Sequence, residues 1–432
     1  MNARYGFFLA LLLAPLGLAC SDDDERDGGT NTPTDSGFVD LGTSDVGPLD
    51  QGLDGGGPED TGLTEDTGFL IPDGGAGGDV GPSDGGNGGP IVAPDHEWTW
   101  VPVPGSRCIN NSETGFGVNL DAASTKLVIF MNGGNACFNV GSCLVTANVD
   151  GYGQAKFDRE KAGLNGAAFD RTANENYFRD WSYVYLPYCS GDVFAGTKGT
   201  TTLEGSTYTF QGYTNVGLFL ERIVPTFPNV TEVMLTGVSA GGFGAFTNYD
   251  QVATAFGPNV KVTLIDDSGP PMNASFVPAC LQTHFANTWG LNDGPLAACG
   301  PACTASADGT FMVPFLEYML TKYPDRNFGL ISSAQDSTIR TFWGYGNNNC
   351  SMLSPGFQPP AYTGPRFQMG LIDLRDNVFS AHNNAKLYMP NGTRHVWQNS
   401  PTWTINENGV VLQDWIRQAI EDDAAWTHAP VP

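Results

Sequence analysis

One six-residue motif constrains the fold of this chain more than any other feature: GVSAGG at residues 237–242. It follows the apolar run 232–236 and opens a segment of small residues. Glycines two positions either side of a serine are typical of a sharp strand-to-helix turn, because they leave room for its strained backbone. We therefore expect Ser239 to present its hydroxyl at the end of a strand, with the amino end of a helix directed at it.

Short apolar runs alternate with helical segments around this motif. We expect strands at 127–131, 181–188, 233–236, 260–265, 328–332 and 385–389, and helices at 216–224, 242–255, 312–322 and 410–420. Pro225 is expected to stop the first of these helices. The pattern predicts an α/β fold, a hydrolase-like, mostly parallel sheet with helices on both faces and disulfide-bearing insertions. In such sheets the functional residues gather at the carboxyl ends of the strands.

The amino-terminal part has the composition of an export signal followed by a tether. Residues 1–19 carry one cation and then an apolar stretch, and Cys20 follows directly, which predicts lipidation of Cys20 at a cell surface of bacterial type or, alternatively, plain secretion. Residues 20–90 are expected to be a disordered Asp/Gly-rich tether, because few apolar residues and high charge do not support a core. No stretch of it fits a calcium-binding loop. Residues 91–432 are then the folded domain.

Charge limits the partners. The chain has a net charge of −26, and residues 91–432 carry about −11 of it once the tether's −16 and the +1 of Arg4 are set apart. Nucleic acid is excluded as a partner, because phosphate binding needs basic clusters. A polyanionic substrate is not attracted electrostatically either. We expect a monomer that meets a membrane only through an anchor at Cys20.

Eight cysteines remain besides Cys20, and an even number in an exported chain predicts disulfides. They are Cys108, Cys137, Cys143, Cys189, Cys280, Cys299, Cys303 and Cys350. No CxxC motif occurs and no histidine lies at ligand spacing, so we expect neither a metal nor a cofactor.

A serine nucleophile needs a histidine and an acid, which follow it in chain order in hydrolases of this type. His395 comes soon after the last expected strand, where such a histidine belongs, and His382, before that strand, is the reserve candidate. Asp336 follows the second strand beyond the serine and is the expected acid. Asp267, one strand earlier, is the alternative acid or a residue of the active-site wall.

Stabilising an oxyanion needs two backbone amides. The residue after the nucleophile, Ala240, provides one. The loop NGGNAC at 132–137 follows the strand 127–131, and its paired glycines let the backbone turn amides toward a ligand. An ordinary Gly-Gly turn is the other interpretation of this loop.

These segments together resemble the pectin acetylesterase and Notum family of serine carboxylesterases. The resemblance rests on residues 129–137, on PYCSGD at 187–192, on GVSAGG at 237–242 and on Asp267-Ser268-Gly269, and it extends to His395 and Asp414-Trp415. It implies a triad of Ser239, Asp336 and His395, oxyanion amides from Gly134, Asn135 and Ala240, and Asp192 and Asp267 as candidate substrate-lining residues. Asn132 and Asn135 stand where family members commonly carry an acidic residue and a tryptophan.

The predicted function is thus an exported serine carboxylesterase. The resemblance implies an acylated carbohydrate or a small acyl ester as substrate, with removal of acetyl from a polysaccharide such as pectin as the leading expectation. Hydrolysis of longer acyl esters, as in the Notum branch, is the alternative within enzymes. A non-catalytic cell-surface binding protein on the same fold is the alternative outside them.

Overall fold

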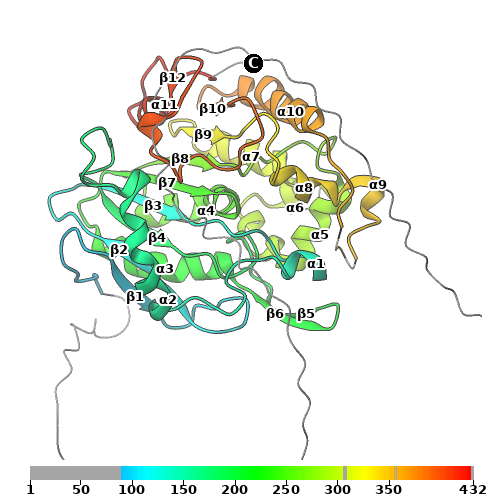
Figure 1. The fold of residues 1–432 in the computed structure, drawn as a ribbon, viewed down its shortest axis with the longest axis horizontal. Helices are drawn as coiled ribbons and strands as arrows, with labels where there is room; N and C mark the ends of the chain where they lie inside the picture. Colours follow the sequence, from blue (N-terminus) through cyan, green and yellow to red (C-terminus); the bar gives the residue numbers. More distant parts are fainter. Residues whose placement is uncertain (1–88, 305–308, 355, 357, 430–432) are drawn as a thin grey trace, which may run out of the picture. The chain divides into compact units, whose positions relative to one another are not determined.

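An eight-stranded sheet is the central feature of the computed structural model, which describes residues 89–304, 309–354, 356 and 358–429 (Figure 1). Its order is β1-β2-β4-β3-β7-β8-β9-β10. The first two pairs are antiparallel, and every pair from β4 to β10 is parallel. This confirms the predicted mostly parallel α/β sheet. The strands are β1 (Thr99–Val103), β2 (Thr114–Asn119), β3 (Lys126–Met131), β4 (Ser182–Leu186), β7 (Glu232–Val238), β8 (Lys261–Asp267), β9 (Phe328–Ile331) and β10 (Ala385–Tyr388).

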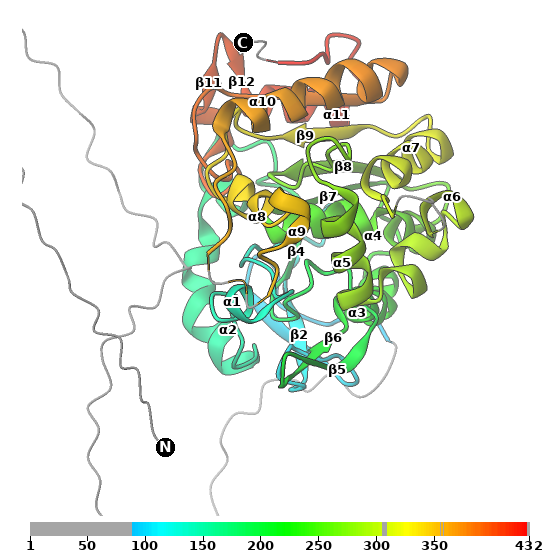
Figure 2. The same cartoon turned by 90° about the vertical axis from the view of Figure 1, so that its right-hand side faces the viewer.

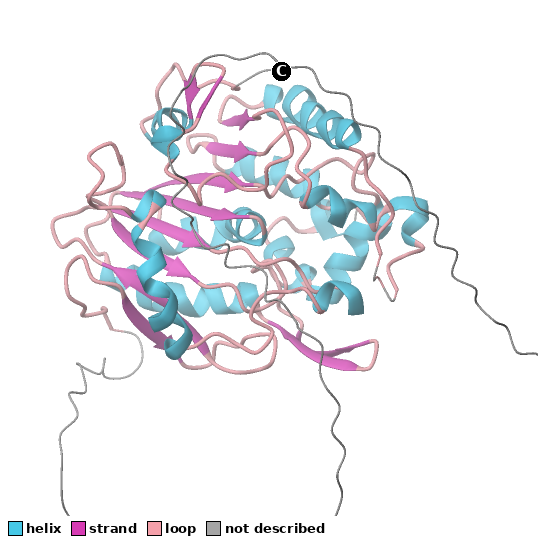
Figure 3. Ribbon diagram, in the orientation of Figure 1, coloured by secondary structure: helices cyan, strands magenta, loops and turns pink. Residues whose placement is uncertain are grey.

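Both faces of the sheet are buried, as the near-continuous apolar strands predict. Along β3, Leu127, Ile129 and Met131 pack on one side and Val128 and Phe130 on the other. The first face is covered by α3 (Gly212–Thr226) and α4 (Ala240–Phe256), and the second by α2 (Gln154–Glu160) and α11 (Leu412–Ile420), as Figure 3 shows. The expectation of helices on both faces is therefore confirmed.

Most of the remaining helices lie in the chain between β8 and β10 (Figure 2). They contribute to the same core as α4, so they thicken that face of the sheet. Only α7 was predicted, and its bounds are those observed. The helices are α5 (Ala279–Trp289), α6 (Pro301–Thr304), α7 (Met312–Lys322), α8 (Ile339–Gly344), α9 (Asn347–Cys350) and α10 (Gly364–Asp373).

Smaller elements complete the described chain. A short helix, α1 (Val140–Cys143), follows β3, and two hairpins are formed by β5 (Gly199–Leu203) with β6 (Ser206–Phe210) and by β11 (Asn406–Glu407) with β12 (Val410–Val411). The last hairpin corrects the expected helix at 410–420, which begins two residues later because its two valines pair as a strand. Pro225 lies inside α3 as its penultimate residue instead of directly after it.

All eight cysteines of the folded part are paired, which confirms the disulfide prediction. The bonds are Cys108–Cys189, Cys137–Cys143, Cys280–Cys350 and Cys299–Cys303. Within the described ranges no helix is long and apolar enough to cross a membrane, and no three His, Cys, Asp or Glu side chains converge as metal ligands. The predicted export signal and Cys20 lie outside the described residues, as does all of the tether but its last two positions.

Candidate active site

Ser239 occupies the turn between β7 and α4 with φ 58° and ψ −120°, a conformation that a residue with a side chain rarely adopts. The flanking glycines make the turn sterically feasible. A Cβ atom on Gly237 would lie 2.2 Å from the carbonyl oxygen of Gly241, and one on Gly241 would lie 2.0 Å from that of Met131. A Cβ atom on Gly242 would lie 2.4 Å from Oδ1 of Asp266. All three glycines of the motif are thus required by the packing of the turn.

The predicted acid and base meet. His395 Nδ1 lies 2.8 Å from Asp336 Oδ2, and Asp336 is fully buried. The other oxygen of Asp336, Oδ1, accepts 2.9 Å hydrogen bonds from the amides of Thr338 and Ile339, which hold the carboxylate in place. A carboxylate at Nδ1 favours the tautomer that leaves Nε2 unprotonated, which is the form a general base needs.

No hydrogen bond joins His395 to Ser239 in the structure. The Nε2 atom of His395 is buried and makes no hydrogen bond to any described residue. The structure pairs Asp336 with His395 and not with the reserve candidate His382. Asp267, the alternative acid, directs its carboxylate to the backbone amides of Trp397 and Gln398.

The predicted oxyanion loop lies against the serine. A Cβ atom on Gly133 would lie 3.1 Å from Ser239 Cβ, and Asn135 adopts a left-handed φ of 65°. The amides of Gly134 and Asn135 donate no hydrogen bond within the described residues. Ala240 is the first residue of α4, so its amide has no acceptor inside the helix. The amides of Gly134, Asn135 and Ala240 thus have no acceptor among the described residues, which is a condition that an oxyanion donor must meet.

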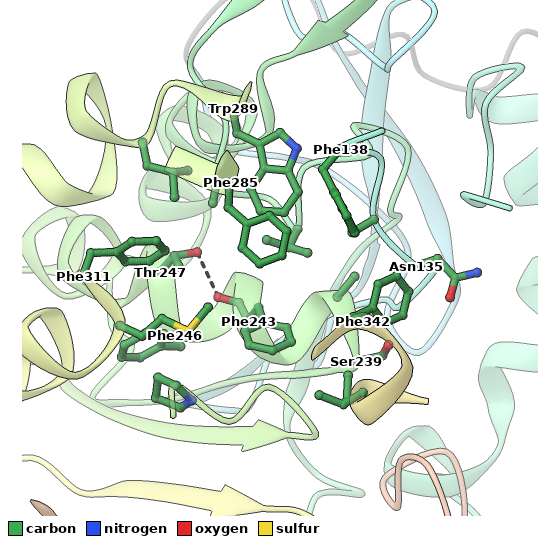
Figure 4. A pocket seen from close by; sticks show the side chains of 18 of the residues that line it. Asn135, Phe138, Ser239, Phe243, Phe246, Thr247, Phe285, Trp289, Phe311 and Phe342 are labelled. Atoms are coloured by element: carbon green, nitrogen blue, oxygen red, sulfur yellow. Dashed lines mark hydrogen bonds between the residues drawn. The ribbon is translucent and has the colours of Figure 1, made fainter. Parts of the chain in front are cut away.

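An apolar cavity opens beside Ser239 (Figure 4). Its volume is about 60 Å³. Apart from Asn135, Ser239 and Thr247, its lining side chains are aliphatic or aromatic. Ser239 at the turn before α4 and Phe243 and Thr247 within it stand four residues apart, so they line the cavity from one side of the helix. Eight residues of helix span about 12 Å, so the cavity follows α4 for roughly two turns from the serine.

Aromatic rings from segments far apart in sequence close this cavity. Phe138 packs edge-to-face on Phe285 of α5 at 4.9 Å between ring centroids and on Tyr345 at 5.2 Å. Trp289 Nε1 donates a 2.8 Å hydrogen bond to the carbonyl oxygen of Cys137. The disulfides Cys137–Cys143 and Cys280–Cys350 tie the same segments. The cavity wall is thereby cross-linked as well as packed.

Asp192 and Asp267, the candidate substrate-lining residues, are both fully buried, and neither is among the residues that line this cavity. Asp192 accepts hydrogen bonds from Ser190 Oγ at 2.5 Å and from the amide of Gly212 at 2.8 Å, so it fixes the loop between β4 and α3. Its neighbours Val193 and Ala195 line the cavity instead.

The aromatic wall of the cavity was missed at the level of sequence. Phe243, four residues after Ser239, carried the signal, since it shares the helix face that the nucleophile occupies. The cavity-lining residues of α5 and α8 gave no such sequence signal, because their distance from Ser239 depends on how two insertions fold over the sheet.

The fold and the site define a class: an α/β protein with a serine at a strand-to-helix turn, a His–Asp pair and free backbone amides. The chain belongs to the pectinacetylesterase family, whose model matches residues 98–347. The relatives matched include proteins named as a palmitoleoyl-protein carboxylesterase and a pectin acetylesterase.

Individual relatives are more distant. The chain is 26% identical over 182 residues to palmitoleoyl-protein carboxylesterase NOTUM of Homo sapiens and 28% identical over 178 residues to notum2 of Xenopus laevis. Each match covers 38% of this chain and 34% of the relative. Pectin acetylesterase 5 of Arabidopsis thaliana is 24% identical over 172 residues, which cover 39% of this chain and 40% of the relative. The chain thus matches only about a third to two fifths of the length of these proteins.

Solved structures agree on the fold. A structure of the Wnt deacylase Notum from Drosophila superimposes with a TM-score of 0.52 at 20% identity, covering 78% of this chain and 97% of that chain. A second crystal form gives a TM-score of 0.50 at 19% identity, covering 75% and 93%. At this level of identity the likeness concerns the fold.

Proposed function

We propose that the chain is an exported serine carboxylesterase whose preferred acyl group is longer than acetyl. Ser239 attacks the ester carbonyl, His395 takes the serine proton and passes it to the leaving alcohol, and water then releases the acid from the acyl-enzyme. Asp336 orients His395, and the amides of Gly134, Asn135 and Ala240 stabilise the oxyanion. The four disulfides support an oxidising, exported location.

The observation that carries the acyl preference is the cavity along α4. An acetyl group needs space for one methyl, whereas this cavity continues from Ser239 to Thr247 between aromatic side chains. Burying a methylene contributes about 0.8 kcal/mol, so a cavity of this kind favours each added carbon until it is filled. The relatives named palmitoleoyl-protein carboxylesterases support the same direction.

Charge around the cavity favours a neutral ester. Residues 132–149, 268–292 and 341–364, which supply much of its wall, contain no Asp, Glu, Lys or Arg. His284 is their only histidine, and it bonds the carbonyl oxygen of Phe138 at 2.6 Å. A polyanionic chain such as polygalacturonate therefore finds no cationic partner in these segments.

Deacetylation of a polysaccharide is the second candidate. The family model and the plant pectin acetylesterase relative favour it. Under this alternative the apolar cavity stays empty during the reaction, and the sugar binds at its mouth.

Chain-length dependence separates the two candidates. With p-nitrophenyl acetate, butyrate and octanoate, we expect kcat/KM to rise at least 10-fold from acetate to octanoate, since each buried methylene adds about 0.8 kcal/mol. Thr247→Phe, which fills the cavity two helical turns from Ser239, should remove most of this gain. It should leave acetate turnover within about threefold, because an acetyl group at Ser239 does not reach a position about 12 Å further along the helix.

The control for that variant is Thr254→Phe, a change of the same type on α4 beyond the cavity lining. It should leave the chain-length profile unaltered. A profile that is highest for acetate and insensitive to Thr247→Phe would contradict the acyl preference and favour deacetylation.

A further inference from the structure

Asp267 joins the two halves of the candidate site. It is the last residue of β8 and pairs with Val238, the residue before Ser239. Its carbonyl oxygen accepts a 2.8 Å hydrogen bond from the amide of Ser239. Its side-chain Oδ2 accepts hydrogen bonds of 2.7 Å from the amides of both Trp397 and Gln398, two and three residues after His395. One residue therefore holds the serine turn by its main chain and the histidine loop by its side chain.

Ser268 extends this connection by one more amide. Its Oγ donates to Asp267 Oδ1 at 3.0 Å and accepts from the amide of Val396 at 3.3 Å. Ser268 and Val396 both adopt left-handed φ values, 70° and 56°. Such conformations cost about 1–3 kcal/mol in residues with a side chain and persist where surrounding contacts enforce them. The strain lies at the residues that join β8 to the loop of His395.

The same loop is held from a second direction. Trp397 Nε1 donates to Ser333 Oγ at 3.0 Å, and the Gln398 side chain bonds Thr236 Oγ1 at 2.8 Å. These contacts hold the side chains of Trp397 and Gln398, whereas Asp267 holds the backbone amides of the same two residues. The position of the imidazole relative to Ser239 thus depends on a carboxylate that has no exposure to substrate.

We propose that Asp267 is a positioning residue for the reaction, which keeps the His395 loop in register with the Ser239 turn and adds a second negative charge behind the imidazole. The inference rests on the proposed function, because it assigns Asp267 a part in the chemistry of Ser239 and His395. Asp336 remains the residue that bonds the imidazole directly.

The charge of Asp267 is more than the fold requires. An asparagine could accept the same two amides and donate its amide to Ser268 Oγ. Burial raises the pKa of Asp267 from its ordinary value of 3.8 to about 6, although the amides of Gln398 and Trp397 and nearby His395 lower it. A raised carboxyl pKa means that folding stability is lost as the pH rises from about 4 to about 6, where the folded carboxyl ionises. A buried charge that lowers the folding stability is commonly retained because the activity of the protein requires it.

Asp267→Asn tests the proposal, with Asp192→Asn as the matched control. Both aspartates are fully buried, accept a backbone amide and a serine hydroxyl, and have a pKa raised to about 6 by burial, but Asp192 makes no contact with the His395 loop. Misplacing a catalytic group by about 1 Å costs about 10²-fold, so kcat of Asp267→Asn on p-nitrophenyl butyrate should fall about 10²-fold with KM within about threefold. Asp192→Asn should keep kcat within about threefold per folded molecule, since it leaves that geometry intact.

The pH profile supplies a readout that loss of structure would not move. The titratable or charged groups at the same end of the sheet as Asp267 are Asp266 on β8, Asp336 after β9, and Arg394 and His395 on the loop. Lys261 of β8 and Glu232 of β7 pair with each other at the opposite end of these strands. Removing a negative charge near His395 disfavours its protonated form, so the acid limb of kcat/KM should move to lower pH in Asp267→Asn. The acid limb of Asp192→Asn should stay in place.

Should Asp267→Asn fail to fold, Ser268→Ala keeps the proposal testable, because it releases the Val396 amide and removes one hydrogen bond to Asp267 Oδ1 while the carboxylate keeps its bonds to the amides of Trp397 and Gln398. A kcat loss of about 10-fold or more would support the proposal, and an unchanged kcat would overturn it. The proposal would also be overturned if kcat of Asp267→Asn stayed within about threefold of the wild type, or if Asp192→Asn lost as much kcat as Asp267→Asn. If the wild type shows no ester turnover that depends on Ser239, the proposed function itself is wrong, and the inference on Asp267 is wrong with it.

Discussion

Ser239→Ala should lower kcat for ester hydrolysis by about 10⁴- to 10⁶-fold, the range found when a triad nucleophile is removed. The serine hydroxyl is the atom that forms the acyl-enzyme, so nothing in the remaining site replaces it. The free amides of Gly134 and Asn135 can still polarise a carbonyl, which is why some activity above the uncatalysed rate should persist. The measurement is single-turnover and steady-state hydrolysis of p-nitrophenyl butyrate.

The alanine variant needs a control for the loss of a buried hydroxyl. Ser106 is fully buried and bonds the carbonyl oxygen of Val103, far along the chain from the site. Ser106→Ala should change kcat by less than about threefold while it costs about 1 kcal/mol of stability, the usual contribution of such a hydrogen bond. Equal activity in Ser239→Ala and the wild type would rule out the serine mechanism.

His395→Ala should lower kcat by a similar factor, because a serine without its base is a weak nucleophile at neutral pH. The structure gives this histidine a buried acid at Nδ1 and leaves Nε2 without a partner among the described residues. The double variant Ser239→Ala/His395→Ala should be no slower than either single variant, since residues that act as one unit are not additive.

His382→Ala is the matched control for the histidine. It removes the same side chain from the other side of β10, where the structure shows no link to Asp336. Its kcat should stay within about threefold of the wild type, because the His395–Asp336 pair is left intact. A large loss in His382→Ala together with an active His395→Ala would reverse the assignment of the base.

The central sheet and the serine turn were predictable because local signals specify them. Strands β3 and β7 are each built around a short apolar run, and their positions agree with the prediction to within two residues. The turn at Ser239 is specified by glycines whose Cβ atoms would collide with neighbouring backbone. The approach of Asp336 to His395 also follows from local order, because both lie beyond the carboxyl ends of neighbouring parallel strands, β9 and β10.

The antiparallel edge and the cavity were not predictable in the same way. β1 and β2 are short strands whose pairing joins segments that no periodic pattern links. The cavity wall combines Phe138 with α5 and α8, and the contact depends on insertions held by the Cys280–Cys350 bond. Cysteine pairing is not deducible from sequence, so neither is this enclosure.

Asp267 shows a different limit. Its place at the end of the strand next to the nucleophile suggested an active-site wall residue or the catalytic acid, because a side chain at the end of β8 can serve in either position. Its actual partners, the amides of Trp397 and Gln398, lie about 130 residues further along the chain. A side chain that binds backbone leaves no signature in the residue types of its partners.

The central claim is that Ser239 is an activated nucleophile, and covalent labelling tests it most directly. A fluorophosphonate probe reacts with an activated serine, forming a phosphorus–oxygen bond and releasing fluoride. After labelling and proteolysis, peptide mass spectrometry should place one adduct on Ser239, and neither Ser239→Ala nor His395→Ala should be labelled at a comparable rate. A folded, disulfide-bonded wild type that takes up no label, or takes it up at another residue while it hydrolyses esters, would contradict the account and favour a binding protein or a different nucleophile.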